Sequence, residues 1–260
     1  MKKLFFIILA GSLISPALAQ DKSVKQSKKE ERRLRINAIA KQEEEGVIKY
    51  TKHTVVGGKF TSDGYGGFVE IGRAQSIQRS LLYQLEITER KHQKEEKQSL
   101  YNNTAPLIFG KINFLYPVKL GVQQQFLLGN KGNKNGVAIT ANVGGGVIAG
   151  LLRPYNVEID SAGQRMFVNY QTDSAAYFNY ANYIGGPNFG TGWKQVKVRP
   201  GIYLKPALRF DYGKYNEMVN ALEVGLIAEL YSKEIQQMIY SKPQKFFFSA
   251  YVSLMFGRRK

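Results

Sequence analysis

The chain has 260 residues and no cysteine, which excludes disulfides, thiol nucleophiles and thiolate metal sites. Its formal net charge is +17, from 37 Lys and Arg against 20 Asp and Glu, and falls by two to +15 without Lys2 and Lys3. No helix-turn-helix or RNA-binding aromatic motif accompanies this charge, so we expect no nucleic acid as a partner.

The first element along the chain is a leader typical of export. Two lysines precede an apolar run over residues 4–13, and Ala17-Leu18-Ala19 stands before Gln20. A charged start, a short apolar core and small residues at a cleavage site define a signal peptide. The core is well short of the roughly 20 residues that a membrane-spanning helix needs. We therefore expect residues 1–19 to be removed, and no lipoprotein anchor.

Residues 20–45 form a second, highly charged segment. Lys, Arg, Glu and Gln dominate it, and the pairs Glu31/Arg35 and Lys41/Glu45 have the i,i+4 spacing that supports a helix. A stretch of this composition is either a solvated helix or a disordered tail. We expect a short periplasmic helix or tail that is a docking segment or only leads to the first strand.

From residue 46 to residue 260 the chain alternates between apolar and mixed side chains. In residues 246–256 every second position is apolar: Phe246, Phe248, Ala250, Val252, Leu254 and Phe256. Because lipid requires an apolar outer face and a closed sheet satisfies every backbone group, this pattern predicts a transmembrane strand. The expected fold class is all-β, a transmembrane antiparallel β-barrel of about eight strands. The strands are expected at residues 47–60, 65–75, 78–90, 109–128, 136–157, 196–212, 217–232 and 245–257.

The lengths of the connections support an even number of strands. Such barrels have short periplasmic turns and longer outer loops in alternation. The connections after the second, fourth and sixth strands are short and rich in turn formers. Those at 91–108 and 158–195 are long, 233–244 is intermediate, and only the first outer turn at 61–64 is short.

A soluble β-sandwich or a lipocalin-like barrel is the competing fold, since it would place the apolar set inside. Three features favour lipid. The apolar set is almost unbroken over whole strands, the other set holds charges flanked by glycine, and aromatic residues recur near the strand ends.

The mixed faces of the expected strands carry both signs of charge. Buried charges are costly unless they are paired, and an eight-stranded interior is just wide enough for side chains to fill. We therefore expect an ion-pair network inside a narrow barrel, and keep a proton path or a polar pore as alternatives. The residues assigned to this network are Lys119, Lys205, Arg209, Glu223, Glu229 and Glu86.

The outer loops offer a second set of candidate residues. A segment of mixed charge follows the third strand, and the 158–195 loop is rich in Tyr, Asn and Gly. For an exported basic chain we expect lipopolysaccharide, outer-membrane lipid headgroups or acidic proteins as partners, and such residues suit contact with them. The aromatic loop would equally suit an ordered cap over the barrel mouth. The candidates are Arg90, Lys91, His92, Lys94, Tyr180, Tyr183 and Trp193.

Residues for catalysis are few. The chain has two histidines, and the sole assembly that we can propose for a lipid A-modifying enzyme is His92 with Glu89 and either Ser99 or Ser80. No metal-ligand pattern occurs, because the histidines are isolated and no close run of acidic ligands is present. We expect no enzyme, no metal and no cofactor.

Three parts of the chain resemble a little-characterised family of small outer-membrane β-barrels of Bacteroidetes-type bacteria. These parts are residues 86–92, residues 129–132 together with 150–155, and residues 207–211 together with 253–260. The resemblance implies an outer-membrane location in a Gram-negative bacterium and brings no catalytic residues. We expect a non-enzymatic structural or accessory subunit of an envelope complex for secretion or outer-membrane assembly. A lipid A-modifying enzyme and a small pore remain as alternatives.

Overall fold

The structure is a computed structural model, and it describes residues 32–33, 50–99, 105–132, 136–214 and 217–260. The expected signal peptide at 1–19 therefore lies outside the described residues. So does the charged segment at 20–45, apart from Arg32 and Arg33, which are helical. None of the helices in the described ranges is long and apolar enough to span a membrane.

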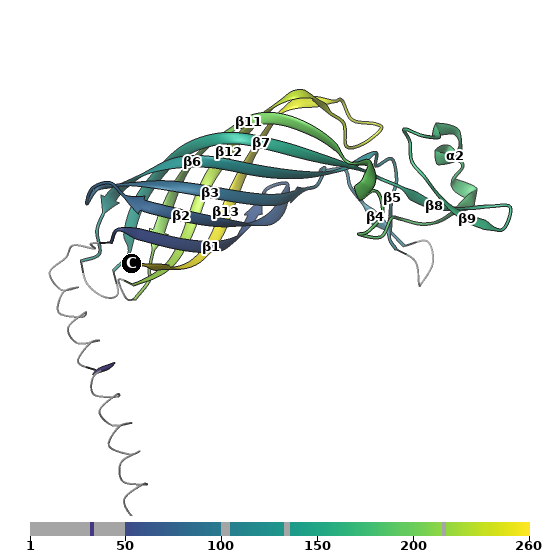
Figure 1. The fold of residues 1–260 in the computed structure, drawn as a ribbon. Helices are drawn as coiled ribbons and strands as arrows, with labels where there is room; N and C mark the ends of the chain where they lie inside the picture. Colours follow the sequence, from purple (N-terminus) through teal and green to yellow (C-terminus); the bar gives the residue numbers. More distant parts are fainter. Residues whose placement is uncertain (1–31, 34–49, 100–104, 133–135, 215–216) are drawn as a thin grey trace, which may run out of the picture.

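Eight antiparallel strands close into a barrel, as the sequence predicts (Figure 1). Each barrel strand pairs with the barrel strands that come before and after it along the chain. The first strand, β1, closes the barrel by pairing with the last, β13, for instance Val56 with Phe256. Closure leaves no free edge, so every backbone ladder is satisfied within the protein. The barrel strands are β1 (Lys52–Thr61), β2 (Gly64–Ala74), β3 (Arg79–Arg90), β6 (Asn113–Gly129), β7 (Ala138–Pro154), β11 (Lys197–Asp211), β12 (Met218–Ile235) and β13 (Gln244–Arg259).

The two faces of the sheet have opposite chemistry. In β13 the predicted apolar set, from Phe246 to Phe256, is exposed on the outside, whereas Ser249, Tyr251 and Ser253 are buried inside. The other strands follow the same alternation, with Leu204 and Leu208 outside and Lys205 and Arg209 inside β11. A soluble barrel or sandwich would have the reverse arrangement. An apolar exterior around a polar interior is the arrangement of a transmembrane barrel.

Short and long connections fall at opposite ends of the barrel. The turn end carries the connections at 75–78, 130–137 and 212–217, and the C-terminal residues lie there too. The opposite end, here called the lobe end, carries the two-residue turn at 62–63 and the long connections 91–112, 155–196 and 236–243. The predicted alternation of connection lengths is therefore present.

The long connections are not simple loops, because together they form a folded lobe that projects beyond the barrel (Figure 1). The lobe contains a three-stranded sheet in the order β10-β8-β9 and a two-stranded sheet of β4 and β5. Its elements are β4 (Lys97–Gln98), β5 (Leu107–Ile108), β8 (Val157–Ser161), β9 (Gln164–Val168), α2 (Ser174–Phe178), η1 (Tyr180–Asn182), β10 (Tyr183–Gly185) and η2 (Trp193–Gln195).

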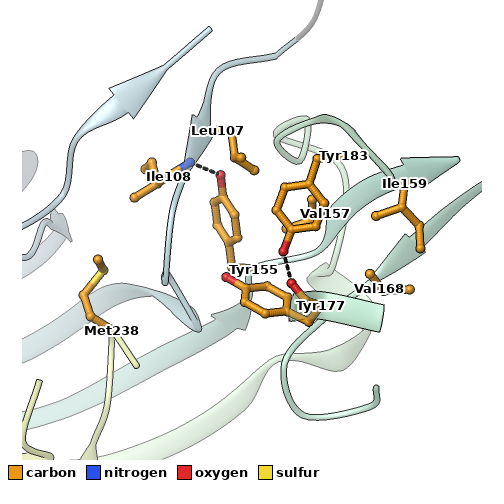
Figure 2. Packing of buried hydrophobic residues seen from close by; sticks show 9 residues of the cluster. All are labelled: Leu107, Ile108, Tyr155, Val157, Ile159, Val168, Tyr177, Tyr183 and Met238. Atoms are coloured by element: carbon orange, nitrogen blue, oxygen red, sulfur yellow. Dashed lines mark hydrogen bonds between the residues drawn. The ribbon is translucent and has the colours of Figure 1, made fainter. Parts of the chain in front are cut away.

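A hydrophobic core of its own holds the lobe together. Figure 2 shows Tyr155 Oη accepting a hydrogen bond of 2.7 Å from the amide of Ile108, and Tyr183 donating to the carbonyl of Tyr177. All three long connections contribute, since Ile108, Tyr177 and Met238 come from different ones. The cluster comprises Leu107, Ile108, Tyr155, Val157, Ile159, Val168, Tyr177, Tyr183 and Met238.

Candidate functional site

The interior of the barrel holds a continuous column of paired charges. Its half nearer the lobe is centred on Lys119, which donates to Oε1 of Glu86 at 2.9 Å and lies 2.9 Å from Oε1 of Glu229. Glu86 and Lys119 are register partners on β3 and β6, so their side chains meet on the same face of the sheet. Lys59 on β1 reaches the second oxygen of Glu86. Arg90 donates to Glu229 at 2.6 Å and closes this half of the column.

The outermost pair of the column lies at its lobe end. Arg90 Nε is 2.6 Å from Oδ2 of Asp63, in the turn between β1 and β2. The guanidinium also donates to Oγ of Ser249, which in turn donates to Asp63. Arg90 is 5% exposed, so the column is nearly shut off from solvent at this end.

The half nearer the turn end is centred on Arg209. Its guanidinium donates to both oxygens of Glu70, each at 2.8 Å, and from Nε and Nη2 to Glu223 at 2.9 and 2.7 Å. Two-pronged contacts of this kind are the strongest that arginine forms with carboxylates. Lys205 lies 3.1 Å from Glu223, and His53 Nε2 lies 3.2 Å from Glu70.

An aromatic ring joins the two halves. Lys59 Nζ lies 4.3 Å and Lys205 Nζ 5.2 Å from the ring centre of Tyr251, whose hydroxyl donates to Glu223 at 2.7 Å. The face of an aromatic ring attracts cations, so Tyr251 stabilises two ammonium groups that would otherwise repel each other.

The column is electrically balanced and fills the interior. It has five cations and five carboxylates, so its net charge is zero when His53 is neutral. Except for Asp63, every member is at most 5% exposed. Its members are Lys59, Arg90, Lys119, Lys205, Arg209, Asp63, Glu70, Glu86, Glu223 and Glu229.

The structure brings together all six residues that the sequence assigned to an interior network: Lys119, Lys205, Arg209, Glu223, Glu229 and Glu86. Four further residues belong to the column, although the sequence interpretation left them out of it: Lys59, Asp63, Glu70 and Arg90. The signal was present, because alternation in β1 and β2 places Lys59 and Glu70 on the inner face. They were missed because the rest of that face is mostly glycine and apolar.

Two of the residues expected to make outer contacts are turned inward, which corrects those expectations. Arg90 is the last residue of β3 and continues its inner face after Glu86 and Thr88. Tyr183 is 5% exposed and belongs to the lobe core.

The other residues expected to make outer contacts lie near the surface or are only partly described. Lys94 is exposed, Lys91 and His92 are half-buried, and Trp193 is 37% exposed. Tyr180 begins η1, and its side chain is outside the described part. Contacts of these residues with headgroups or a partner remain predictions.

His92 makes local contacts at the base of the lobe. Its Nδ1 accepts from the amide of Lys94 at 3.2 Å, and its own amide donates to Glu95. Burial lowers the pKa of His92 below its usual 6.5; Glu95 opposes the shift, and Lys94 and Lys111 add to it.

The assembly proposed for lipid A modification is not brought together around His92. Ser80 lies near the turn end, and the ten residues of β3 from Ser80 to Arg90 span about 33 Å at the rise of an extended strand, so Ser80 is far from His92. No described contact joins His92 to Glu89 or Ser99. Within the described ranges there is also no cluster of three or more His, Asp or Glu side chains that could hold a metal.

An arginine in an aromatic cage marks the junction of barrel and lobe. The guanidinium carbon of Arg153 lies 4.2 Å from the ring centre of Phe114 and 5.2 Å from that of Trp193. Tyr116 and Phe189 complete the cage at 5.6 and 5.5 Å. The cage is occupied by the protein's own cation, so its role is to hold the 186–196 segment against β6 and β7. No sequence pattern pointed to it, because its rings come from distant segments.

The closed barrel, its apolar exterior and its charged interior together define a small β-barrel protein of the outer-membrane type. No protein-family model and no curated protein matches the chain. Similar solved structures include the N-terminal β-barrel domain of Pseudomonas aeruginosa OprF, with 11% identity over 80% of this chain and 99% of that chain, at a TM-score of 0.33.

Two further similar structures are small barrels as well. Ail, the attachment invasion locus protein of Yersinia pestis, is 9% identical over 82% of this chain and 100% of that chain, at a TM-score of 0.38. Neisserial surface protein A is 11% identical over 80% and 96%, at 0.34. At these TM-scores the likeness adds nothing to what the strand pairing already shows.

Proposed function

We propose that this chain is a sealed, non-enzymatic anchor in the outer membrane of a Gram-negative bacterium, and that it displays its lobe to protein partners. In this role it is a structural or accessory subunit of an envelope complex for secretion or outer-membrane assembly. The signal peptide and the Bacteroidetes-type origin remain predictions from the sequence.

The observation that carries the proposal is the balanced, buried charge column. An open pore needs a continuous water-filled path, whereas here the interior side chains reach across the barrel and pair with each other. Arg209, for example, joins Glu70 on β2 to Glu223 on β12. Moving these side chains aside would leave charges unpaired in a narrow interior, at a cost of several kcal/mol for each. The alternative of a small pore is therefore disfavoured.

The lobe supports the second half of the proposal. A barrel that serves only as an anchor needs no folded structure beyond its rim, yet three connections combine into one core here. The lobe also exposes large apolar side chains such as Met166 and Phe167 on β9. Exposed apolar groups on a folded surface are typical of protein contact sites.

The test is purification from native membranes in mild detergent, followed by mass spectrometry of the proteins that accompany the chain. We expect partners in fixed ratio, and we expect Met166→Ser with Phe167→Ser to remove them. Ile77→Ser is the control, because Ile77 is an apolar residue at the turn end that is even more exposed than Met166 and Phe167. Recovery of the barrel alone would contradict the accessory role.

Conductance tests the sealed interior separately. In planar bilayers the purified chain should give no discrete current steps, since the column blocks the interior. Steps whose ion selectivity changes in Glu223→Gln would instead establish a pore.

A further inference from the structure

The outer face of the barrel carries a one-sided group of basic residues at its turn end. Arg258 on β13, Lys52 on β1, Arg73 on β2 and Arg79 on β3 are all exposed. These four strands are neighbours in the barrel. The four residues, here called the basic arc, therefore lie side by side along one part of the rim.

Strand register brings the charges of the arc close together. Lys52 and Arg73 are register partners, and Arg258 pairs with Thr54, the next outward residue of β1 after Lys52. Like charges directly opposite each other on one face destabilise a sheet. Among the described residues no ion pair relieves this repulsion for any of the four, and Arg79 has only the ring of Phe126, 5.7 Å away. Within the part of the chain that the structure describes, the arc thus has no counter-charges paired with it.

The arc borders the apolar outer surface of the barrel on the side of the turn end. Two residues further along the same faces stand the exposed side chains of Phe256 in β13 and Ile71 in β2. Two strand residues span about 7 Å, so the cations lie just outside the apolar zone, within reach of headgroups.

The opposite part of the rim has a different character. On β6, β7, β11 and β12 the outward strand residues at this end are uncharged, among them Leu128, Ile139, Phe210 and Met218. At the turn end, the outward charges carried by the strands themselves are thus confined to the part made by β13, β1, β2 and β3. The exposed charges near β11 and β12 at this end, Lys214 and Glu217, lie in the connection between these two strands.

We propose that the basic arc binds the phosphate headgroups of anionic phospholipid in the leaflet at the turn end of the barrel. Arginine matches phosphate through paired hydrogen bonds, and three of the four residues are arginines. A phosphate shared by Lys52 and Arg73 relieves their repulsion. This inference rests on the proposed function, because it requires the barrel to lie in a membrane.

The test uses the full chain reconstituted in phosphatidylcholine bilayers with a trace of spin-labelled phosphatidylglycerol or phosphatidylcholine. We expect the wild type to associate preferentially with phosphatidylglycerol, by roughly fivefold for each cation in contact with the headgroup, and less at high salt. The variant with Lys52, Arg73, Arg79 and Arg258 all changed to Gln should lose the preference. The matched control changes Lys97, Lys194, Lys242 and Lys245, all exposed near the lobe end, to Gln, and should keep most of it.

Three outcomes overturn the inference. Equal association of both lipids with the wild type is the first, and a preference that survives in the arc variant is the second. Proteins that co-purify with the wild type but not with the arc variant, without any lipid preference in the bilayer, would assign the arc to an acidic protein and also overturn it.

Membrane insertion is measured on the same samples, by protease protection of the strands and by the heat-dependent shift in gel mobility of a folded barrel. Failure to insert contradicts the proposed function itself, whereas insertion without lipid preference contradicts only the arc. A second readout is Arg73→Gln, which should raise the Tm in zwitterionic detergent because it removes the repulsion with Lys52. When phosphatidylglycerol is added, the increase in Tm should be smaller for Arg73→Gln than for the wild type.

Discussion

Removal of the charge of Glu223 on β12 should strongly destabilise the barrel. Its carboxylate accepts from Arg209, Asn142 and Tyr251 and lies 3.1 Å from Lys205. Glu223→Gln keeps the shape but leaves the half-column nearer the turn end with two cations and a single carboxylate, Glu70.

The size of the effect follows from the burial of the site. Glu223 and Lys205 have no exposed surface, so water cannot replace the lost carboxylate. Removing one partner of a buried ion pair costs about 3–5 kcal/mol. We expect a loss of that order in the free energy of unfolding, measured by urea unfolding of the protein folded into lipid vesicles.

Two further variants isolate the cause. Glu217→Gln removes an exposed carboxylate in the turn before β12 and should change stability by less than about 0.5 kcal/mol. Glu223→Gln combined with Lys205→Gln restores the balance of charge, so the double variant should be more stable than Glu223→Gln alone. A loss below about 1 kcal/mol in Glu223→Gln, or a double variant that is simply additive, would refute the interpretation of the column as mutually dependent pairs.

Three smaller predictions concern the lobe and its junction with the barrel. Arg153→Lys should lower stability by about 1–2 kcal/mol in thermal unfolding, because an ammonium group cannot stack in a four-ring cage. Ala162 has a φ of 52° in the turn between β8 and β9, a backbone conformation that asparagine adopts more readily than alanine. Ala162→Asn should therefore stabilise this hairpin and slow its cleavage by protease, and faster cleavage would show that the turn is not strained at this position. Because its pKa is lowered, His92 binds fewer protons when folded, so stability should rise with pH up to about 6.5. This rise should flatten in His92→Gln, and an unchanged pH profile would exclude His92 as its source.

The barrel could be predicted from the sequence because its signal is local. Alternation with a period of two is visible within any single strand, and lipid outside makes one face strictly apolar. The observed β13, Gln244–Arg259, differs from the predicted 245–257 by one residue at its start and two at its end. Glu86 and Lys119 were assigned to the interior by the same alternation.

The lobe could not be predicted in the same way because its signal is not local. The hydrogen bond between Tyr155 and Ile108 joins residues that are 47 positions apart, and no short sequence pattern predicts such a contact. For Arg90 the prediction was wrong for a different reason: it was expected to make outer contacts, but it lies inside the barrel. The charged residues 89–96 around it resemble a loop, although strand alternation already places Arg90 inside.

A narrow barrel with a charged interior raises the question of why the interior is not apolar. Well-packed apolar residues would often be as stable as buried ion pairs. Both faces of every strand would then be apolar, and a strand shifted in register would meet little penalty. With Arg209 opposite Glu223, a shift by one residue places charges in lipid, and a shift by two separates the partners. We therefore infer that the column specifies register.

Cysteine cross-linking tests this inference cleanly, because the chain has no cysteine of its own. Leu208 and Val224 are outward register partners on β11 and β12, so Leu208→Cys with Val224→Cys should form a disulfide in the native barrel. Leu208→Cys with Leu226→Cys, shifted by two residues, should not. The same pairs are then placed in a background where the half-column nearer the turn end is apolar, with Glu70→Leu, Glu223→Leu, Lys205→Met and Arg209→Met. In that background both pairs should cross-link. If only the native pair does so there, register is set by something other than the charges.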